Sequence, residues 1–172
     1  CVCVCRTLFI SSSNMSVANI SVRRSITDDI PAIRALLSGQ DADAYASLFG
    51  ETINLSTLIE TSYLSITALN RYNAVIGFIS LSDAPRNVDS IPADIWHVWL
   101  RQGGYVQLDQ EARNINPCNT LWVTCMALQT SSADQGDVLH TMLNTTFATC
   151  CLVHHVLFLC PNVPTGEAPS NI

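Results

Sequence analysis

The chain has 172 residues, of which 48% are hydrophobic, and its formal net charge is −6. This length and apolar content suffice for one folded domain with its own core, and they exclude wholesale disorder. All eight basic residues are arginine, and an acidic chain lacks the basic face that nucleic-acid binding requires. No apolar run is long enough to span a bilayer, so neither nucleic acid nor a membrane is an expected partner.

The eight cysteines indicate a reducing, intracellular compartment rather than a disulfide framework. Cys125 and Cys160 fall inside predicted core strands, where a free cysteine behaves as a small hydrophobe. Because the first residue is not Met, we interpret the chain as a fragment or an open-ended gene model. Cys1–Asn14 is excluded from the fold as a leader, residues 15–164 form the predicted domain, and residues 165–172 form a polar tail.

The first elements predicted are a strand and a helix. Ile20–Arg24 alternates in polarity as a short strand does. Thr27 or Asp29 can cap the helix that follows, and Gly39 stops it. Apolar residues at helical spacing form its predicted buried stripe, namely Ile30, Ile33, Leu36 and Leu37.

The middle of the chain predicts a second helix, a hairpin and an insertion. Asn54–Glu60 predicts a short helix. Tyr63–Leu69 and Ala74–Leu81 predict two antiparallel strands joined by a turn at Asn70–Asn73. Asp94–Leu100 predicts a helical insertion with aromatic and apolar residues on or near one face. Those residues are Ile95, Trp96 and Trp99.

The last part predicts a strand, a helix and a strand. Asn119–Leu128 is almost wholly apolar, which is typical of a strand buried on both faces. Gln129–Gly136 is polar, and a helix begins from about Ser132. Val153–Cys160 predicts a second strand, parallel to the first as in a βαβ unit. No further strand follows Val153–Cys160, so we expect it to form an uncovered edge of the sheet. The helical stripe is Val138, Leu139, Met142, Leu143 and Phe147.

This order of elements resembles the opening of the Gcn5-related N-acetyltransferase (GNAT) fold. Val22–Leu37 is similar to the way in which such domains begin. The resemblance implies an α/β fold with a mixed sheet and flanking helices. It also implies truncation, because the GNAT fold continues with another helix and two more strands.

The loop after the fourth strand decides whether this fold binds acetyl-coenzyme A. In working acetyltransferases it has the form Gln/Arg-x-x-Gly-x-Gly/Ala, and its backbone N–H groups cradle the pyrophosphate. Here the loop keeps Gln129 and one glycine, Gly136, and it has no basic residue. Asp134 and Asp137 fall where the phosphates would sit, and like charges disfavour that binding.

The same segment is typical of an ordinary helix start. Ser131 or Ser132 with Asp134 or Gln135 forms an N-cap pattern. The central strand offers no carboxylate or histidine as a general base. We therefore predict a degenerate acetyl-coenzyme A loop, no catalytic residue and no cofactor.

A zinc site is a further alternative, because cysteine and neutral histidine are the usual zinc ligands. The candidate ligands are Cys150, Cys151, His154, His155 and Cys160. Strand side chains alternate between faces, so His154 and His155 diverge, and the structural interpretation is favoured with no metal bound. His97, next to Trp96, is interpreted as a packing or surface residue.

Several stretches together resemble one acetyltransferase-like family, the N-terminal domain of cilia- and flagella-associated protein sixty-one. They are Leu48–Glu60, Ile76–Val88, Asn119–Trp122 and Val156–Pro161. The resemblance implies a non-catalytic structural module of the motile-cilium axoneme, in the calmodulin- and spoke-associated complex at the radial spoke base. It implies partners within that complex. The alternatives are an active GNAT-type acetyltransferase and a zinc-binding module.

Overall fold

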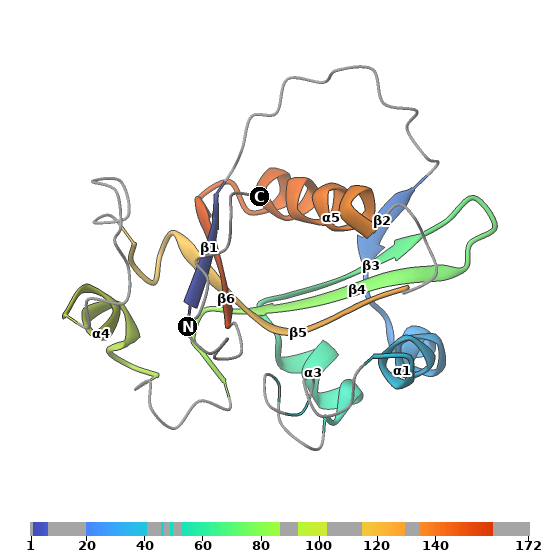
Figure 1. The fold of residues 1–172 in the computed structure, drawn as a ribbon, viewed down its shortest axis with the longest axis horizontal. Helices are drawn as coiled ribbons and strands as arrows, with labels where there is room; N and C mark the ends of the chain where they lie inside the picture. The colour runs from blue at the N-terminus through green and yellow to red at the C-terminus, as the bar shows by residue number, and fades with distance from the viewer. Residues whose placement is uncertain are drawn as a thin grey trace, which may run out of the picture.

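The computed structural model describes residues 2–6, 20–40, 46, 49, 53–86, 93–102, 115–129 and 135–159. In these ranges the strands form one six-stranded mixed sheet in the order β1-β6-β5-β4-β3-β2 (Figure 1). From β2 onward, the elements follow one another as the truncated GNAT-like fold predicts, and helices flank the sheet on both faces. The predicted fold class is therefore confirmed.

The first predicted strand and both helices that follow it are present. They are β2 (Ser21–Arg24), the 3-10 helix η1 (Thr27–Asp29), α1 (Ile30–Ser38) and α3 (Leu55–Thr61). Gly39 caps the end of α1, as predicted, and its N–H donates to the Leu36 carbonyl. Of the four residues in the predicted stripe only Ile33 is fully buried, so the buried face of α1 is narrower than its sequence pattern indicates.

The predicted hairpin consists of β3 (Leu64–Leu69) and β4 (Val75–Ser82), which pair antiparallel. Its turn is held by Asn70, whose Oδ1 accepts from the backbone N–H groups of Tyr72 at 2.9 Å and Ala74 at 3.0 Å. Asn73 completes the turn with a positive φ of 60°, a conformation that asparagine tolerates better than most residues.

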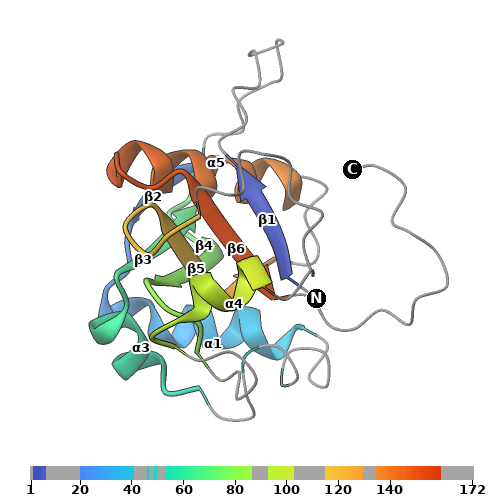
Figure 2. The same ribbon diagram turned by 90° about the vertical axis from the view of Figure 1, so that its left-hand side faces the viewer.

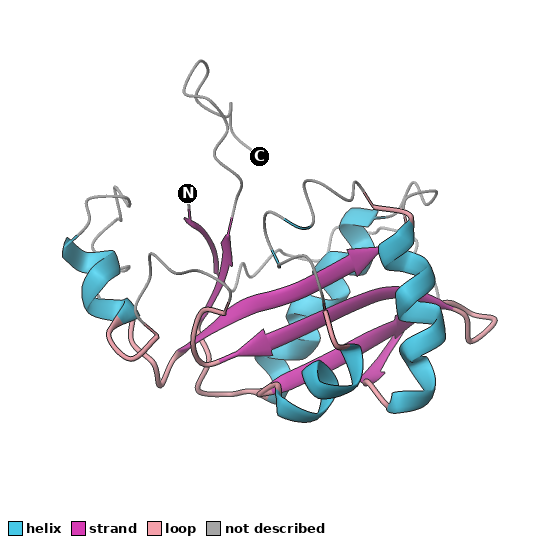
Figure 3. Ribbon diagram, turned by 90° about the horizontal axis from the view of Figure 1, so that it is seen from below, coloured by secondary structure: helices cyan, strands magenta, loops and turns pink. Residues whose placement is uncertain are grey.

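The βαβ unit is also confirmed. It consists of β5 (Thr120–Leu128), α5 (Gln135–Thr149) and β6 (His155–Leu159), and β6 pairs parallel to β5. This pairing joins only Thr120–Trp122 to residues 155–157, and β6 then turns away from the long strands (Figure 3). The predicted helix start at Ser132 lies outside the described residues.

The expectation of an uncovered edge at β6 is wrong. A strand from the leader, β1 (Val2–Arg6), pairs antiparallel with β6 along its whole length, with Val2 opposite Leu159 and Arg6 opposite His155. The physical reason is already in the sequence: Cys-Val-Cys-Val-Cys is an extended pattern of small and β-branched residues. The sequence analysis places Cys1–Asn14 outside the fold as a leader, so it does not predict this pairing.

The insertion forms α4 (Trp96–Gln102), and one part of its prediction fails. Trp96 is buried, and its Nε1 donates to the Asp83 carbonyl at 3.2 Å. The Trp96 ring also meets Trp122 edge to face, with centroids 5.3 Å apart. Ile95 does not share a helical face with Trp96 as predicted, because it precedes α4 and lies in a turn, where it is 48% exposed. The Trp99 side chain lies outside the described residues.

The two faces of the sheet are covered differently. Helix α5 lies on one face, and α1 and α3 lie on the other (Figure 2). Under α5 the contacts are apolar, and the core includes Leu64, Ile66, Ile79, Leu81, Val123, Val138 and Met142. Under α1 and α3 a smaller cluster is formed by Ile33, Leu55, Leu58, Phe78 and Cys125. No helix in the described part of the chain is both long and apolar enough to cross a membrane.

Candidate functional site

The junction between β5 and α5 is where the fold would place a coenzyme. Gln129 follows the last residue of β5, and Gln135 is the first residue of α5. Residues 130–134 lie outside the description, and the predicted N-cap residues Ser131, Ser132 and Asp134 are among them. The residues of this site that the structure describes are therefore those at the two ends of the loop.

Backbone groups at the end of β5 are already occupied by the protein. The Gln129 N–H donates to the Ile76 carbonyl at 3.0 Å, which continues the ladder with β4. The Leu128 carbonyl accepts from Nε2 of Gln40 at 2.8 Å, and the Gln129 carbonyl accepts from Nε2 of Gln135 at 2.9 Å. An amide-bearing ligand would have to displace these hydrogen bonds to reach the strand end. Nothing in the sequence signals the role of Gln40, because it lies 88 residues away from Leu128.

The helix end of the junction has the wrong charge for a pyrophosphate. Asp137 lies in the first turn of α5, where its carboxylate complements the positive end of the helix dipole. Gly136 is exposed, and a Cβ added there would meet no atom within 4 Å. The packing of the protein therefore does not require this glycine. In the described residues of the junction there is no arginine or lysine to balance a phosphate.

Beyond Trp122, β5 pairs with β4 alone among the described strands. The pairing between β4 and β5 shifts register after Ser80, and Thr124 is the extra residue. The Thr124 hydroxyl lies 3.0 Å from Ser80 Oγ and 3.1 Å from the Ser80 carbonyl, so it is used internally. Ser80 Oγ also lies 2.6 Å from Ser62 Oγ, whose hydroxyl donates to the Leu58 carbonyl. Within the described part of the chain, the recorded partners of these hydroxyls are one another and backbone carbonyls, so they form a structural chain.

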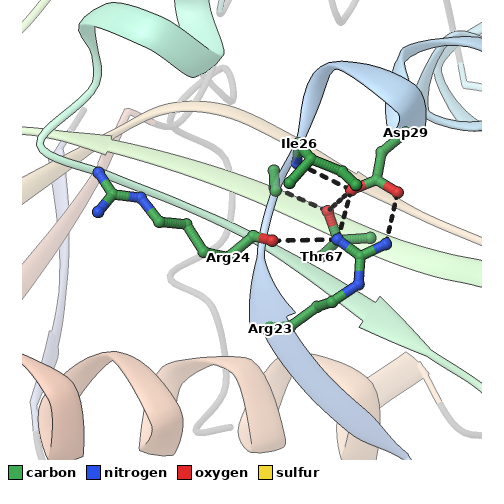
Figure 4. Close-up of polar contacts among 6 residues, drawn as sticks. Arg23, Arg24, Ile26, Asp29 and Thr67 are labelled. Atoms are coloured by element: carbon green, nitrogen blue, oxygen red, sulfur yellow. Dashed lines mark hydrogen bonds and ion pairs between the residues drawn. The ribbon is translucent and has the colours of Figure 1, made fainter.

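A second polar network joins β2, η1 and β3 (Figure 4). Arg23 holds both carboxylate oxygens of Asp29, at 2.7 Å and 2.8 Å. The Asp29 carboxylate also accepts from the Ile26 N–H at 3.0 Å and from the Thr67 hydroxyl at 3.3 Å. Ser25 Oγ completes the network, 2.7 Å from Thr67 Oγ1.

Asp29 caps the start of η1 and not α1 itself, because its carboxylate accepts from the N–H of Ile26, the N-cap residue of η1. It precedes α1, but its side chain makes no capping bond to that helix and turns back to Ile26 and Arg23. Burial raises the pKa of Asp29, but the bonds from Arg23 and Ile26 outweigh burial and lower this pKa below its usual value. A carboxylate held in this way is a structural anion, not a general base.

The candidate zinc ligands do not come together in the part of the chain that the structure describes. In the described residues no three groups of the kinds that bind metals come together, and Cys160 lies outside them. Cys150 is half-buried, Cys151 and His154 are exposed, and His155 is buried at the start of β6. Burial, with Cys151 beside it, raises the pKa of the Cys150 thiol and disfavours the thiolate that binds metal.

His97 has the environment of a packing residue. It is half-buried, and its ring meets the Trp96 ring edge to face at 5.7 Å. This agrees with the expectation from the sequence.

Comparison with known proteins identifies the family. A family model described as cilia- and flagella-associated protein 61, N-terminal domain, matches residues 21–170. The chain belongs to this family. The resemblance predicted from the sequence is thereby confirmed, and membership places the chain among proteins associated with cilia and flagella.

A curated relative and several solved structures are also similar. Cilia- and flagella-associated protein 61 of Tetrahymena thermophila is 26% identical over 149 residues, which cover 81% of this chain and 8% of the relative. The chain thus spans about 8% of the length of that relative.

Among solved structures, the GNAT family N-acetyltransferase YhbS from Escherichia coli in complex with CoA is 16% identical, with a TM-score of 0.43. The match covers 81% of this chain and 62% of YhbS. A ribosomal-protein-alanine N-acetyltransferase from Brucella melitensis biovar Abortus 2308 is 12% identical, covers 86% and 84% of the two chains, and has a TM-score of 0.45. No conclusion about activity follows from likenesses this remote.

Proposed function

We propose that this chain is a non-catalytic structural and interaction module of the motile-cilium axoneme. Within the axoneme we assign it to the calmodulin- and spoke-associated complex at the radial spoke base. Its partners are other axonemal proteins of that complex. Family membership supports the ciliary part of this proposal, and the β5–α5 junction supports the non-catalytic part.

The non-catalytic hypothesis depends mainly on the end of β5, where backbone carbonyls are already hydrogen-bonded within the protein. The backbone carbonyls of Leu128 and Gln129 are held by the side-chain amides of Gln40 and Gln135. Asp137 occupies the helix end where a phosphate would need positive charge. Catalysis by acetyl transfer needs a positioned coenzyme, and these groups oppose its binding. We therefore propose that Gln129 and Gly136 mark a degenerate coenzyme loop.

Imaging of the full-length protein tests the proposal. The protein carries a fluorescent tag in flagellated cells, and the cells are extracted with detergent so that only the axoneme remains. We expect the signal to stay on the axoneme with the regular spacing of the radial spokes. A free fluorescent tag in the same cells is the control, and it should wash out. A signal that is diffuse in the cytosol and absent from the extracted axoneme would refute the proposal.

A further inference from the structure

An open groove lies between α1 and the ends of the long strands, on the same face of the sheet as the Arg23–Asp29 network. Its volume is about 630 Å³. One wall is a small-residue face of α1 that includes Ala32, Ala35 and Leu36. The other wall is formed by Val75 of β4 and Leu128 of β5. Most of the surface of this groove is apolar, and the junction described above borders it through Leu128 and Gln129.

One end of the groove is acidic. Asp28 lines it, is exposed, and makes no ion pair within the described part of the chain. The neighbouring Asp29 also lines the groove, but its charge is balanced by Arg23 at 2.7 Å. The groove therefore presents one carboxylate whose charge is not balanced, in a chain whose net charge is −6. A basic side chain is the complement of this end.

The turn at the rim of the groove is held by hydrogen bonds. Asn73 and Ala74 line it, and the Asn70 side chain fixes the turn in which they lie. Tyr72 in this turn is 72% exposed, and the Arg71 guanidinium stacks on its ring at 4.6 Å from the centroid. Tyrosine and arginine are enriched among the residues that dominate binding energy at protein interfaces. Because this turn is already ordered, a partner meets it at a low entropic cost.

The walls fit a protein segment better than a small ligand. Small-molecule pockets bring several polar groups to converge on the ligand. Here the Leu128 and Gln129 carbonyls are held by glutamine amides, and Asn73 and Gln129 are the other polar residues of the lining beside Asp28 and the paired Asp29. The wall formed by the end of η1, by α1 and by its cap runs from Asp28 to Gly39, a length of about 17 Å at roughly 1.5 Å per residue. About five residues of an extended segment cover that distance.

We propose that this groove binds a short apolar segment of a partner protein, and that an arginine or lysine of the segment pairs with Asp28. This inference rests on the proposed function, because it names the kind of partner that an interaction module would take. The apolar side chains of the segment pack on Ala32, Ala35 and Val75.

Site-specific photocrosslinking in the full-length protein tests the contact. Ala74 is exposed at the rim, so Ala74→benzoylphenylalanine places the probe beside the groove without filling it. The control is Thr57→benzoylphenylalanine, at an exposed position of α3 outside the groove. We expect irradiated axonemes to give one defined crosslink from residue 74 and none to the same segment from residue 57. Mass spectrometry should place it in a segment with apolar residues and a basic residue within about five positions.

Charge variants then test the pairing. Asp28→Arg should lower the yield of the residue 74 crosslink about tenfold, because it places like charges together. Glu60→Arg makes the same change of charge at an exposed position of α3 and should leave the yield unchanged. Ala35→Arg fills the groove at an exposed helix position, where folding tolerates it, and should also abolish the crosslink.

The outcomes separate the two proposals. A protein that stays on the axoneme but gives no crosslink from residue 74, or a crosslink that Asp28→Arg and Ala35→Arg leave intact, overturns the groove and leaves the proposed function standing. A crosslink to an acidic segment also overturns it. A protein that is absent from the axoneme overturns both proposals.

Discussion

The two faces of the sheet are held together by different forces. The α5 face is a continuous apolar core, in which Val138 and Met142 pack against Ile79 and Leu81. The α1 and α3 face has fewer buried apolar side chains, and polar groups such as Ser80 and Asp29 are buried beside them. Apolar packing tolerates volume-conserving changes, whereas a buried polar group needs its own partner. The α5 face therefore depends mainly on apolar packing, and the opposite face, which includes the groove, depends also on specific polar partners.

The largest expected effect lies on the α5 face. Met142 is fully buried, and Met142→Ala should lower the free energy of unfolding by about 2–5 kcal/mol through lost contacts and a cavity. His140→Ala, at an exposed position of the same helix, should change it by less than about 0.5 kcal/mol. Urea unfolding followed by circular dichroism measures both. Equal effects from the two variants would mean that α5 is not packed on the sheet.

The sequence predicts the buried residues of the α5 face better than the polar contacts of the opposite face, because apolar spacing is a local pattern and polar partners are distant in sequence. The spacing of Val138, Met142 and Leu143 states directly which side of α5 is buried. The Arg23–Asp29–Thr67 network spans six and 38 residues of sequence, so it depends on strand register that local patterns do not reveal. Asp29 was accordingly predicted as a helix cap.

At the β5–α5 junction, too, some features could be predicted from the sequence and others could not. The absence of basic residues and the acidic Asp137 were readable from the sequence, because charge is a property of residue type. The closure of β5 by Gln40 was not readable, since it depends on where the end of α1 meets the strand. The pairing of Val2–Arg6 with β6 was not predicted, because Cys1–Asn14 was set aside as a leader and its two-residue period was not taken as a strand.

The next largest change in stability is expected from the Arg23–Asp29 network, on the face covered by α1 and α3. Asp29→Asn removes the charge that Arg23 holds with two bonds, and it should lower the free energy of unfolding by about 1–3 kcal/mol at neutral pH. Asp28→Asn is the matched control, because Asp28 is exposed and adjacent. We expect a change of less than about 0.5 kcal/mol for it. If both variants unfold at the same urea concentration as the wild type, the network does not stabilise the fold.

The same network predicts a dependence on pH. The pKa of Asp29 is lower in the folded chain than the ordinary aspartate value, which is about 3.9 in the unfolded chain. The ionised carboxylate therefore stabilises the fold above about pH 4, and this contribution is lost as the pH falls through the folded pKa. Between neutral pH and about pH 3 the wild type should lose more stability than Asp29→Asn. Parallel pH profiles for the two proteins would contradict the charge assignment.

Two glycines allow the core under α5 to be compared with the exposed start of α5. A Cβ at Gly77 would lie 2.8 Å from Val138 Cγ1 and 3.0 Å from Met142 Sδ. Gly77→Ala should therefore cost about 1–3 kcal/mol through overpacking under α5. Gly136→Ala meets open space in the first turn of α5, so it should stabilise the fold by up to about 1 kcal/mol. Thermal unfolding distinguishes the two, and destabilisation by Gly136→Ala would mean that this glycine has a structural role.

The proposed non-catalytic role predicts that the GNAT-like fold of this chain does not bind acetyl-coenzyme A. Isothermal titration of acetyl-coenzyme A into the purified full-length protein tests it most directly, with an active acetyltransferase as the positive control. The closed end of β5 and the acidic start of α5 predict no heat of binding at millimolar ligand. Binding with a Kd below about 100 μM, roughly 5.5 kcal/mol, would contradict this account and favour an active acetyltransferase.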